Sequence, residues 1–297
     1  MKCQLLTCFI LWILLMACST KEPLLTIGLV ADPQYADKPT AGKRYYGESL
    51  WKLEEAIDTF NHYQVDFVQT LGDVIDVKWE SFDAVLPIYE QLDPGIESYQ
   101  LLGNHDFDVD AKRFGELLGK LDMPDYYYSY AKQGWRFIVL DATDYAYYSY
   151  LLHGHDTTEV NRYYAYADGK PNQQRWNGAI GEAQQNWLAQ QLDSATMLDQ
   201  KVILFSHLPL RPLDDPHNLW NNEQILKLIE GRPNVVAYIN GHNHAGAYEV
   251  KDGIHYLTMF GMVDTEDSSY GILEIYQDRL VLKGYGNQES LMMVLGG

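Results

Sequence analysis

Asp, Asn, Gln and His residues stand directly after five apolar runs of this 297-residue chain. These side chains carry the oxygen and imidazole nitrogen atoms that divalent cations bind in proteins. Short apolar runs are typical of buried strands, and open α/β sheets bind ligands at the edge where such strands end. We therefore expect the polar residues after them to meet at one sheet edge. The runs are 24–30, 65–71, 99–102, 202–205 and 235–239.

A pair of divalent ions is the chemistry that this donor set predicts. Two-metal sites that hydrolyse phosphoesters hold their ions ~3.5–4 Å apart, and a shared carboxylate can bridge them. Asp73 is the candidate for this bridge, because Gly72 lets the chain turn sharply after its strand. Without a thiolate, the set suits Mn²⁺, Fe or Zn²⁺ better than a soft metal. The predicted ligands are Asp32, Gln34, Asp73, Asn104, His207, His242 and His244.

A histidine next to these ligands has a different predicted role. His105 follows Asn104 immediately, so it can lie in the site without binding a metal. There it can stabilise charge on the phosphoryl oxygens or protonate the leaving alkoxide, and a packing role is the alternative. Asp106 is expected to orient the His105 ring, as carboxylates commonly do. Asp76 is expected to be a structural hydrogen-bonding group rather than a ligand.

The charge of the chain bears on its partners. The net charge is -19, and no basic tract exists to neutralise a nucleic-acid backbone or to adhere to anionic lipid. Two divalent ions would bring four positive charges to a site where Asp32 and Asp73 contribute two negative ones. The remaining positive charge would attract a phosphate despite the acidic surface. We therefore expect a small phosphorylated molecule as substrate and no nucleic acid.

The apolar periodicity predicts alternating strands and helices followed by a strand-rich end. This order is typical of an α/β fold in four layers, an α-β-β-α sandwich of two mixed sheets flanked by helices. Helices are expected at 46–63, 82–92, around 114–118, 182–195 and 222–230. A hairpin is expected at 126–130 and 135–140, and later strands at 246–250, 255–260, 270–276 and 279–285.

Residues 24–297 are interpreted as one domain that carries a Tyr-rich insertion at 145–178. The insertion lacks clear periodicity, but its aromatic content favours an ordered segment near the site over a disordered one. Its tyrosines could stack on a substrate ring or simply pack against one another. His153 and His155 have ligand-like spacing but no partner motif, so a loop pair is favoured. His62, His217 and His255 are interpreted as ordinary surface or core histidines.

The first residues are interpreted as a targeting segment. Residues 1–17 have a lysine before an apolar stretch that is shorter than the ~20 residues of a membrane span, so we expect a signal peptide. Leu15-Met16-Ala17-Cys18 resembles a bacterial lipobox, which implies cleavage before Cys18 and lipid attachment to its thiol. Residues 18–23 would then be a tether, and the protein an exported, membrane-anchored lipoprotein. The alternative is an ordinary signal peptide with a chance cysteine.

The motifs taken together resemble those of the calcineurin-like metallophosphoesterases. They are Asp32-Pro33-Gln34, Gly72-Asp73-Val74-Ile75-Asp76, Gly103-Asn104-His105-Asp106, the single His207 and Gly241-His242-Asn243-His244. Most of that superfamily has histidine where this chain has Gln34. Gln34, with Arg44-Tyr45-Tyr46 after it, is similar to the manganese-dependent ADP-ribose/CDP-alcohol diphosphatase branch. The loop at 38–43 lacks the aromatic residue that this branch usually carries near the base.

The resemblance implies a hydrolase with two metal ions, most simply Mn²⁺, that cuts the pyrophosphate of nucleoside-diphosphate-linked alcohols or sugars. It also implies how the ligands divide, with Asp73 shared. One metal would take Asp32, Gln34, Asp73 and His244, and the other Asp73, Asn104, His207 and His242. Arg44 is a candidate contact for substrate phosphate, and a salt bridge at the start of the helix is the alternative reading of that residue.

Three other functions are compatible with the same motifs. A phosphomonoesterase or phosphodiesterase, including one for cyclic nucleotides, would use the same metal ligands. A protein phosphatase is disfavoured, because an exported lipoprotein meets few phosphoproteins. A lipoprotein that only binds phosphorylated ligands through metals would have no need of a proton donor such as His105.

Overall fold

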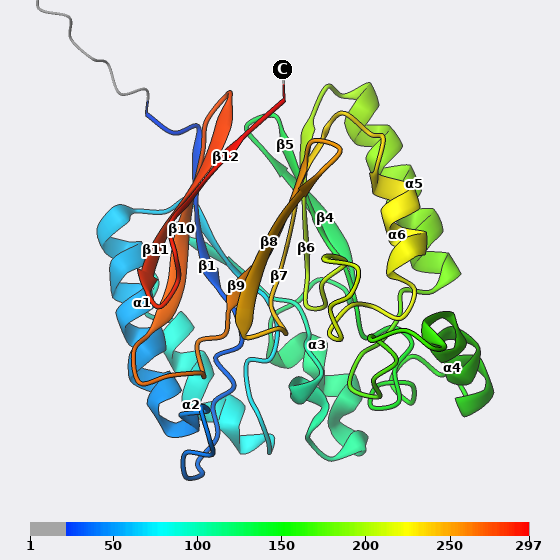
Figure 1. The fold of residues 1–297 in the computed structure, drawn as a ribbon. Coiled ribbons are helices and arrows are strands. Elements are labelled where there is room, and N and C mark those ends of the chain that lie inside the picture. The colour runs from blue at the N-terminus through cyan, green and yellow to red at the C-terminus, as the bar shows by residue number, and fades with distance from the viewer. Residues whose placement is uncertain (1–21, 297) are drawn as a thin grey trace, which may run out of the picture.

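Two six-stranded mixed sheets lie face to face with helices on their outer sides (Figure 1). The computed structural model describes residues 22–296. The first sheet has the order β12-β11-β10-β1-β2-β3, and the second β4-β5-β6-β7-β9-β8. The first sheet comprises β1 (Leu25–Val30), β2 (Phe67–Thr70), β3 (Glu97–Tyr99), β10 (Ser269–Ile275), β11 (Arg279–Gly286) and β12 (Leu291–Val294). The second comprises β4 (Tyr128–Lys132), β5 (Trp135–Val139), β6 (Lys201–Ser206), β7 (Val235–Asn240), β8 (Ala245–Lys251) and β9 (Ile254–Phe260).

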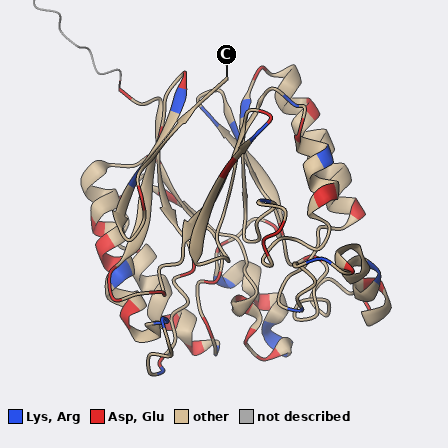
Figure 2. Cartoon of the chain, in the orientation of Figure 1, with Lys and Arg blue, Asp and Glu red and all other residues tan. Residues whose placement is uncertain are grey.

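The helices form the two outer layers. In Figure 1, α1 (Ser49–Tyr63) and α2 (Glu80–Tyr89) lie outside the first sheet, and α5 (Glu182–Met197) and α6 (Asn222–Ile229) lie outside the second. Shorter helices α3 (Leu117–Lys120) and α4 (Thr157–Tyr164) lie near the end where the parallel strands finish. Figure 2 shows Asp and Glu residues on the outer helices of both sides, so the negative charge is spread over the surface. The predicted four-layer α-β-β-α sandwich is confirmed.

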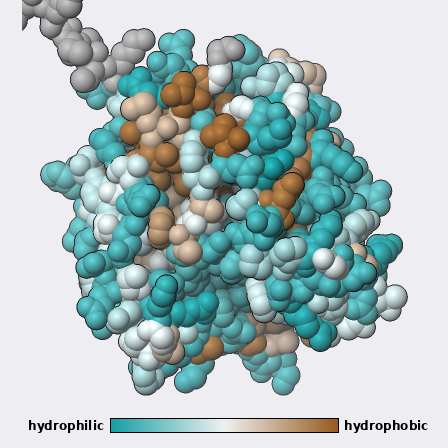
Figure 3. All heavy atoms as spheres, viewed as in Figure 1, coloured by the Kyte–Doolittle hydropathy of each residue, from teal (hydrophilic) through white to brown (hydrophobic). Residues whose placement is uncertain are grey.

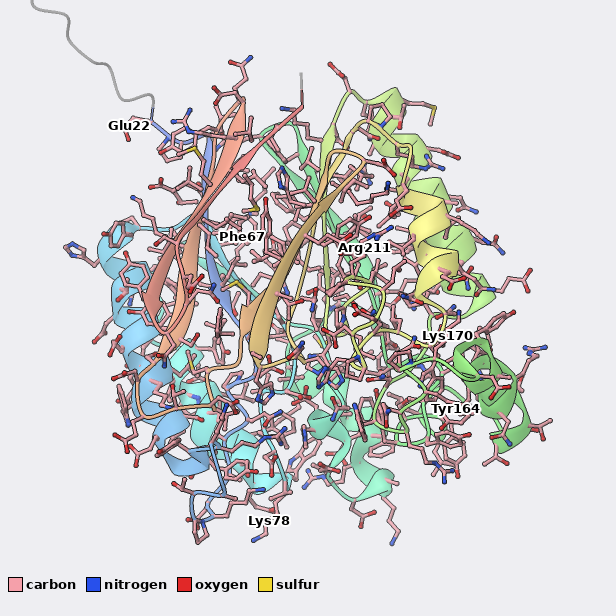
Figure 4. The ribbon with its side chains drawn as sticks, viewed as in Figure 1. Glu22, Phe67, Lys78, Tyr164, Lys170 and Arg211 are labelled. Carbon is pink, nitrogen blue, oxygen red and sulfur yellow. The ribbon has the colours of Figure 1, made fainter. Side chains whose placement is uncertain are left out.

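Aromatic side chains join the two sheets across the centre. Phe67 of β2 lies between the sheets (Figure 4), and its ring centroid is 5.1 Å from that of Phe137 on β5. Phe137 in turn lies 6.1 Å from Phe205 on β6, and all three are fully buried. Burying a phenylalanine side chain stabilises a fold by about 1.5–3 kcal/mol. These contacts hold β2, β5 and β6 in a fixed relation, which matters because polar loops follow the ends of these strands.

The strand registers bring the predicted ligand loops side by side. β1 and β2 are parallel, with Val30 opposite Thr70 at their last residues. β6 and β7 are parallel too, with Ser206 opposite Asn240. Each of these strands therefore ends at the same edge of its sheet, and the loops that begin after them start as neighbours.

Several helices and one strand differ from those expected from the sequence. The first expected helix begins with a 3₁₀ turn, Tyr46–Glu48, before α1. Helix α2 starts and ends earlier than expected and contains Pro87. The insertion contains α4, which was not expected and which begins with a capping box between Asp156 and Glu159. β12 was also not expected, because it is a four-residue strand at a sheet edge.

The expected targeting segment lies before the residues that the structure describes. The expected signal peptide and Cys18 lie outside the described residues 22–296. Within that part of the chain, none of the helices combines the length and the apolar character that a membrane span requires.

Candidate dinuclear metal centre

Left-handed backbone conformations mark the loops that carry the predicted ligands. Asp32, Gln34, Asp73 and His242 have φ angles of 50°, 44°, 50° and 69°. Such conformations in residues other than glycine cost of order 1–3 kcal/mol each and cluster at functional sites. Gly72, with φ 87°, has no room for a side chain, because a Cβ there would lie 2.8 Å from Nδ1 of His207. These turns direct side chains from separate strands into one small volume.

Asp73 lies at the centre of this volume and is fully buried. Its Oδ2 atom lies 2.9 Å from Nε2 of Gln34 on one side and 3.2 Å from Nε2 of His207 on the other. Its Oδ1 atom accepts the backbone N–H of His105 at 2.7 Å. One carboxylate oxygen of Asp73 therefore faces two separate groups of donors, as a bridging ligand must.

The first group of donors consists of Asp32, Gln34 and His244. Nε2 of His244 lies 3.6 Å from Oδ1 of Asp32 and 3.3 Å from the Gln34 amide. Oε1 of Gln34 is buried without a hydrogen-bond partner. Turning this amide over would point its oxygen at Oδ2 of Asp73 and at the His244 ring, and two such oxygens together require a cation between them. The donor set on this side therefore fits a metal ion.

The second group consists of Asn104, His207 and His242. Nδ1 of His242 lies 3.2 Å from Nε2 of His207, which lies 3.2 Å from Oδ1 of Asn104. Asp73, His207 and His242 each present one ligand atom within 4.8 Å of the other two. Within residues 22–296, no other three His, Cys, Asp or Glu residues are grouped in this way. The other six predicted ligands thus lie around Asp73.

Each of the three histidines uses its other ring nitrogen to bond an oxygen outside the centre. Nδ1 of His207 lies 2.8 Å from the Leu71 carbonyl. Nε2 of His242 lies 2.9 Å from Oδ1 of Asn177, and Nδ1 of His244 lies 2.9 Å from Oδ1 of Asp264. An imidazole that donates its proton outward presents a lone pair inward, and this is how metal-binding histidines are commonly oriented. The outward bonds therefore support a metal-binding role for all three rings.

Two of these outward partners were missed by sequence reasoning. Asn177 belongs to the Tyr-rich insertion, and Asp264 follows β9, so neither stands at a strand end that carries a ligand motif. No local pattern of residues could have identified them, because only the folded chain brings them to the rings. The insertion thus contributes to the centre through an asparagine rather than through its tyrosines.

The buried carboxylate and imidazoles shift one another's protonation. Burial alone would raise the pKa of Asp73, but the charges of His207 and His105 lower it well below its usual range overall. Burial alone would lower the pKa of His207, but Asp73 and Asp32 raise it to about 9. Burial lowers the pKa of His242 well below its usual value, and the His207 charge adds to this effect. The centre therefore holds an ionised carboxylate that calls for positive charge.

His105 lies beside this centre without joining the ligand group. Its Nδ1 atom is 2.9 Å from Oδ2 of Asp108 and 3.4 Å from Oδ1 of Asp76. Burial alone would lower the pKa of His105, but Asp73, Asp108 and Asp76 raise it overall. Asp76 also pairs with Lys38, in line with the structural role expected for it. The imidazole is thus held by two carboxylates, and it forms part of the pocket wall.

The expected role of Asp106 is wrong. Its carboxylate does not orient the His105 ring but accepts four backbone N–H groups, at distances of 2.9 to 3.3 Å. The side chain is fully buried beneath the loops, because the 3₁₀ turn of His105–Phe107 directs it back toward the strand ends. Asp106 therefore fastens two ligand loops together. The donors are the N–H groups of Asp73, Val74, Ile75 and Gly103.

A pocket of about 340 Å³ opens over these side chains. Besides ligands and His105, its wall contains Arg44, Trp176 and His217. An adjoining cavity of about 360 Å³ shares Arg44 and His217 with it and also includes Lys43. Within residues 22–296, Arg44 forms no ion pair, so the salt bridge considered as the alternative to a substrate contact is not found. His217, interpreted as an ordinary histidine, lies on the pocket wall instead, with Nδ1 2.8 Å from Oδ1 of Asp215.

Comparison with known proteins assigns the chain to a family. A family model described as calcineurin-like phosphoesterase matches residues 25–246, which include all seven predicted ligands. The chain belongs to the calcineurin-like phosphoesterase family. Members of this family named manganese-dependent ADP-ribose/CDP-alcohol diphosphatase are among its relatives. The one from Xenopus laevis is 28% identical, with 91% of this chain and 90% of the relative covered. The one from Oryza sativa subsp. japonica is 30% identical, with 90% and 92% covered.

A solved structure also resembles the chain over most of its length. A dimetal phosphatase from Danio rerio superposes on the chain with a TM-score of 0.81 and 25% identity, covering 93% of this chain and all of that one. The chain is therefore a metal-dependent phosphohydrolase with a centre of the dimetal type, as its sequence motifs predicted.

Proposed function

We propose that this phosphoesterase is a diphosphatase that cleaves the pyrophosphate of nucleoside-diphosphate-linked alcohols or sugars. The main support for this proposal is the position of Arg44. A pyrophosphate has a second phosphate beyond the one at the metals, and that phosphate needs a cation of its own. Arg44 lies on the wall shared by the two cavities and makes no ion pair within residues 22–296. Guanidinium groups bind phosphate oxygens by paired hydrogen bonds. The names of the relatives support the same substrate class.

Mn²⁺ is the proposed metal. Asp32, Gln34, Asp73 and His244 would hold one ion, and Asp73, Asn104, His207 and His242 the other. Bound ions would supply a water of lowered pKa and offset the charge of the phosphate oxygens. Oxygen and imidazole donors also suit Fe or Zn²⁺. The manganese-dependent relatives favour Mn²⁺.

The other side chains of the pocket have separate roles in this proposal. His105 donates a proton to the leaving oxygen, or a hydrogen bond to the phosphoryl oxygens, while Asp108 and Asp76 fix its ring. Trp176 has 46% of its surface exposed at the pocket wall and offers an apolar face to the substrate's base or alcohol. Arg44 holds the phosphate that stays with the leaving group.

A substrate panel tests this proposal. With Mn²⁺, CDP-choline and ADP-ribose should be hydrolysed with higher kcat/KM than p-nitrophenyl phosphate or a cyclic nucleotide. Arg44→Met should lower kcat/KM for CDP-choline by about 10–100-fold and change hydrolysis of bis-p-nitrophenyl phosphate much less. Arg279→Met, at the other end of the strands, is the matched control. Preference for a monoester or a cyclic nucleotide would instead favour the phosphomonoesterase or phosphodiesterase alternative.

We also propose that the chain is an exported lipoprotein anchored through Cys18. The lipobox-like Leu15-Met16-Ala17-Cys18 supports this proposal. Palmitate added to expressing cells should label the protein, and Cys18→Ala should abolish the label. Labelling that persists in Cys18→Ala would refute the anchor.

A further inference from the structure

Exposed apolar side chains gather at the end of the molecule that is opposite the metal centre. Leu24 and Val294 are 44% and 68% exposed, and Met197 and Leu198, at the end of α5, are 80% and 60% exposed. Val250 and Met292 are 50% and 61% exposed. Figure 3 shows groups of apolar residues among hydrophilic ones on the upper part of this face, where β8 and β12 lie in Figure 1. We call Leu24, Met197, Leu198, Val250, Met292 and Val294 the apolar pole.

Backbone and side-chain contacts tie the parts of this pole together. The turn between β10 and β11 is central, because Leu24 N–H donates to Ile275 O at 2.7 Å and Lys201 Nζ donates to Gln277 O at 2.7 Å. Val294 pairs with Arg279, directly after this turn. The Val294 carbonyl lies 3.0 Å from Nε2 of His255, which pairs with Val250 across the β8–β9 hairpin. These contacts place Leu24, Val250 and Val294 around one turn, and Lys201, which follows the end of α5, joins that turn.

The strands separate the apolar pole from the metal centre. Leu24 precedes β1, and Asp32 follows it; Lys201 begins β6, and His207 follows it. A six-residue strand is about 20 Å long. A surface that covered the pole would therefore leave the metal pocket open at the opposite end.

We propose that the apolar pole rests on the lipid bilayer that holds the chain. The proposal depends on lipid attachment at Cys18, which is six residues before Leu24. Six residues span at most about 20–22 Å, so this end of the domain must lie close to an anchored Cys18. Glu22 is labelled in Figure 4 at the upper end, on the side of the apolar pole.

The charges at this end permit such contact. Lys251 lies 3.4 Å from Asp252, and Arg279 lies 3.0 Å from Asp278, so these two pairs of opposite charge lie next to the apolar side chains. The net charge of the whole chain is -19, which argues against attraction to anionic lipid. The contact is therefore apolar, and we expect it on uncharged phosphatidylcholine as well.

Environment-sensitive labels test the orientation. The other cysteines, Cys3 and Cys8, precede the expected cleavage site, so Met197→Cys would add the only free thiol to the acylated protein. This variant and Val294→Cys carry a nitrobenzoxadiazole label, and the protein is reconstituted into phosphatidylcholine vesicles. We expect a blue shift of the emission at both positions and loss of quenching by an aqueous quencher. Leu151→Cys, on an exposed residue of the Tyr-rich insertion beside the metal centre, should show neither change.

Each other outcome contradicts the proposal. Full access of the quencher to the labels at 197 and 294 on vesicles would overturn it. Shielding that appears without vesicles and rises with protein concentration would assign the pole to a second copy of the chain. Absence of the acyl group on Cys18, checked by mass spectrometry before reconstitution, would remove its basis. None of these results depends on the substrate, because the readout does not involve hydrolysis.

Discussion

Asn177 of the Tyr-rich insertion lies 2.9 Å from the outward ring nitrogen of His242, a predicted metal ligand. The Asn177 amide is fully buried and is itself held, because it donates to the carbonyls of Asn172 and Pro216 at 3.1 and 2.7 Å. The insertion is therefore connected to the metal centre through one side chain, and its order should affect how tightly the centre binds metal.

Asn177→Ala tests this connection. Loss of a hydrogen-bond partner of a metal-binding histidine typically weakens metal affinity by about 10–100-fold. We expect the Mn²⁺ concentration for half-maximal activity to rise by this factor and kcat at saturating Mn²⁺ to fall much less. Asn161→Ala, an exposed asparagine of the same insertion, is the control. An unchanged Mn²⁺ dependence in Asn177→Ala would show that the insertion is independent of the centre.

Asp106→Asn should lower the stability of the fold. The amide keeps one acceptor oxygen in place of two and brings donors to a site that already holds four N–H groups. We expect the free energy of unfolding to fall by about 2–4 kcal/mol, from lost hydrogen bonds to a buried charged group. Urea unfolding of metal-free protein measures this effect. Asp108→Asn, on an exposed residue, should change stability by less than about 1 kcal/mol. Unchanged stability in Asp106→Asn would show that these hydrogen bonds do not fasten the two loops.

The role of His105 depends on the leaving group. His105→Ala should slow hydrolysis of diphenyl phosphate, whose phenolate leaving oxygen is basic, by about 10²–10⁴-fold, if the imidazole donates a proton to that oxygen. Hydrolysis of bis-p-nitrophenyl phosphate should suffer less, because p-nitrophenolate leaves without a proton. Steady-state kinetics of both substrates at saturating Mn²⁺ measure the difference. Equal losses on the two would instead indicate that His105 acts on the phosphoryl oxygens.

Gln34→Leu should weaken one half of the centre selectively. Leucine has a similar size but offers no oxygen, so the ion near Asp32 and His244 loses a ligand. The group of Asp73, His207 and His242 keeps its own donors. We expect metal content after dialysis against Mn²⁺ to fall from two ions per chain toward one. Retention of two ions with full affinity would place Gln34 outside the ligand set.

The sequence was sufficient to predict which polar residues meet at the sheet edge and how the layers are arranged, because both follow from strands of strict register. An apolar run that ends in Asp or His locates a side chain at a sheet edge, and His207 and His242 follow neighbouring parallel strands. Asn177 and Asp264 could not be found in this way, since they reach the rings from loops without periodicity. Asp106 was misread because the sequence does not reveal which way a 3₁₀ turn directs consecutive side chains.

Helix α4 could have been found. Asp156 and Glu159 stand three residues apart in a capping box, which is a recognised sign of a helix start. The helix is polar on average, however, so apolar periodicity did not reveal it. The sequence signal for β12 is weaker, because a four-residue edge strand has too few positions to establish an alternation of apolar and polar residues.

The metal content of Asp73→Asn tests the central claim most directly. The structure presents Oδ2 of Asp73 to both donor groups, so the account predicts two Mn²⁺ ions per wild-type chain. A neutral amide in its place should weaken binding of both ions and abolish hydrolysis of bis-p-nitrophenyl phosphate. Inductively coupled plasma mass spectrometry after dialysis measures the ions, and circular dichroism checks the fold. A folded Asp73→Asn protein that kept two ions and its full turnover would contradict the account.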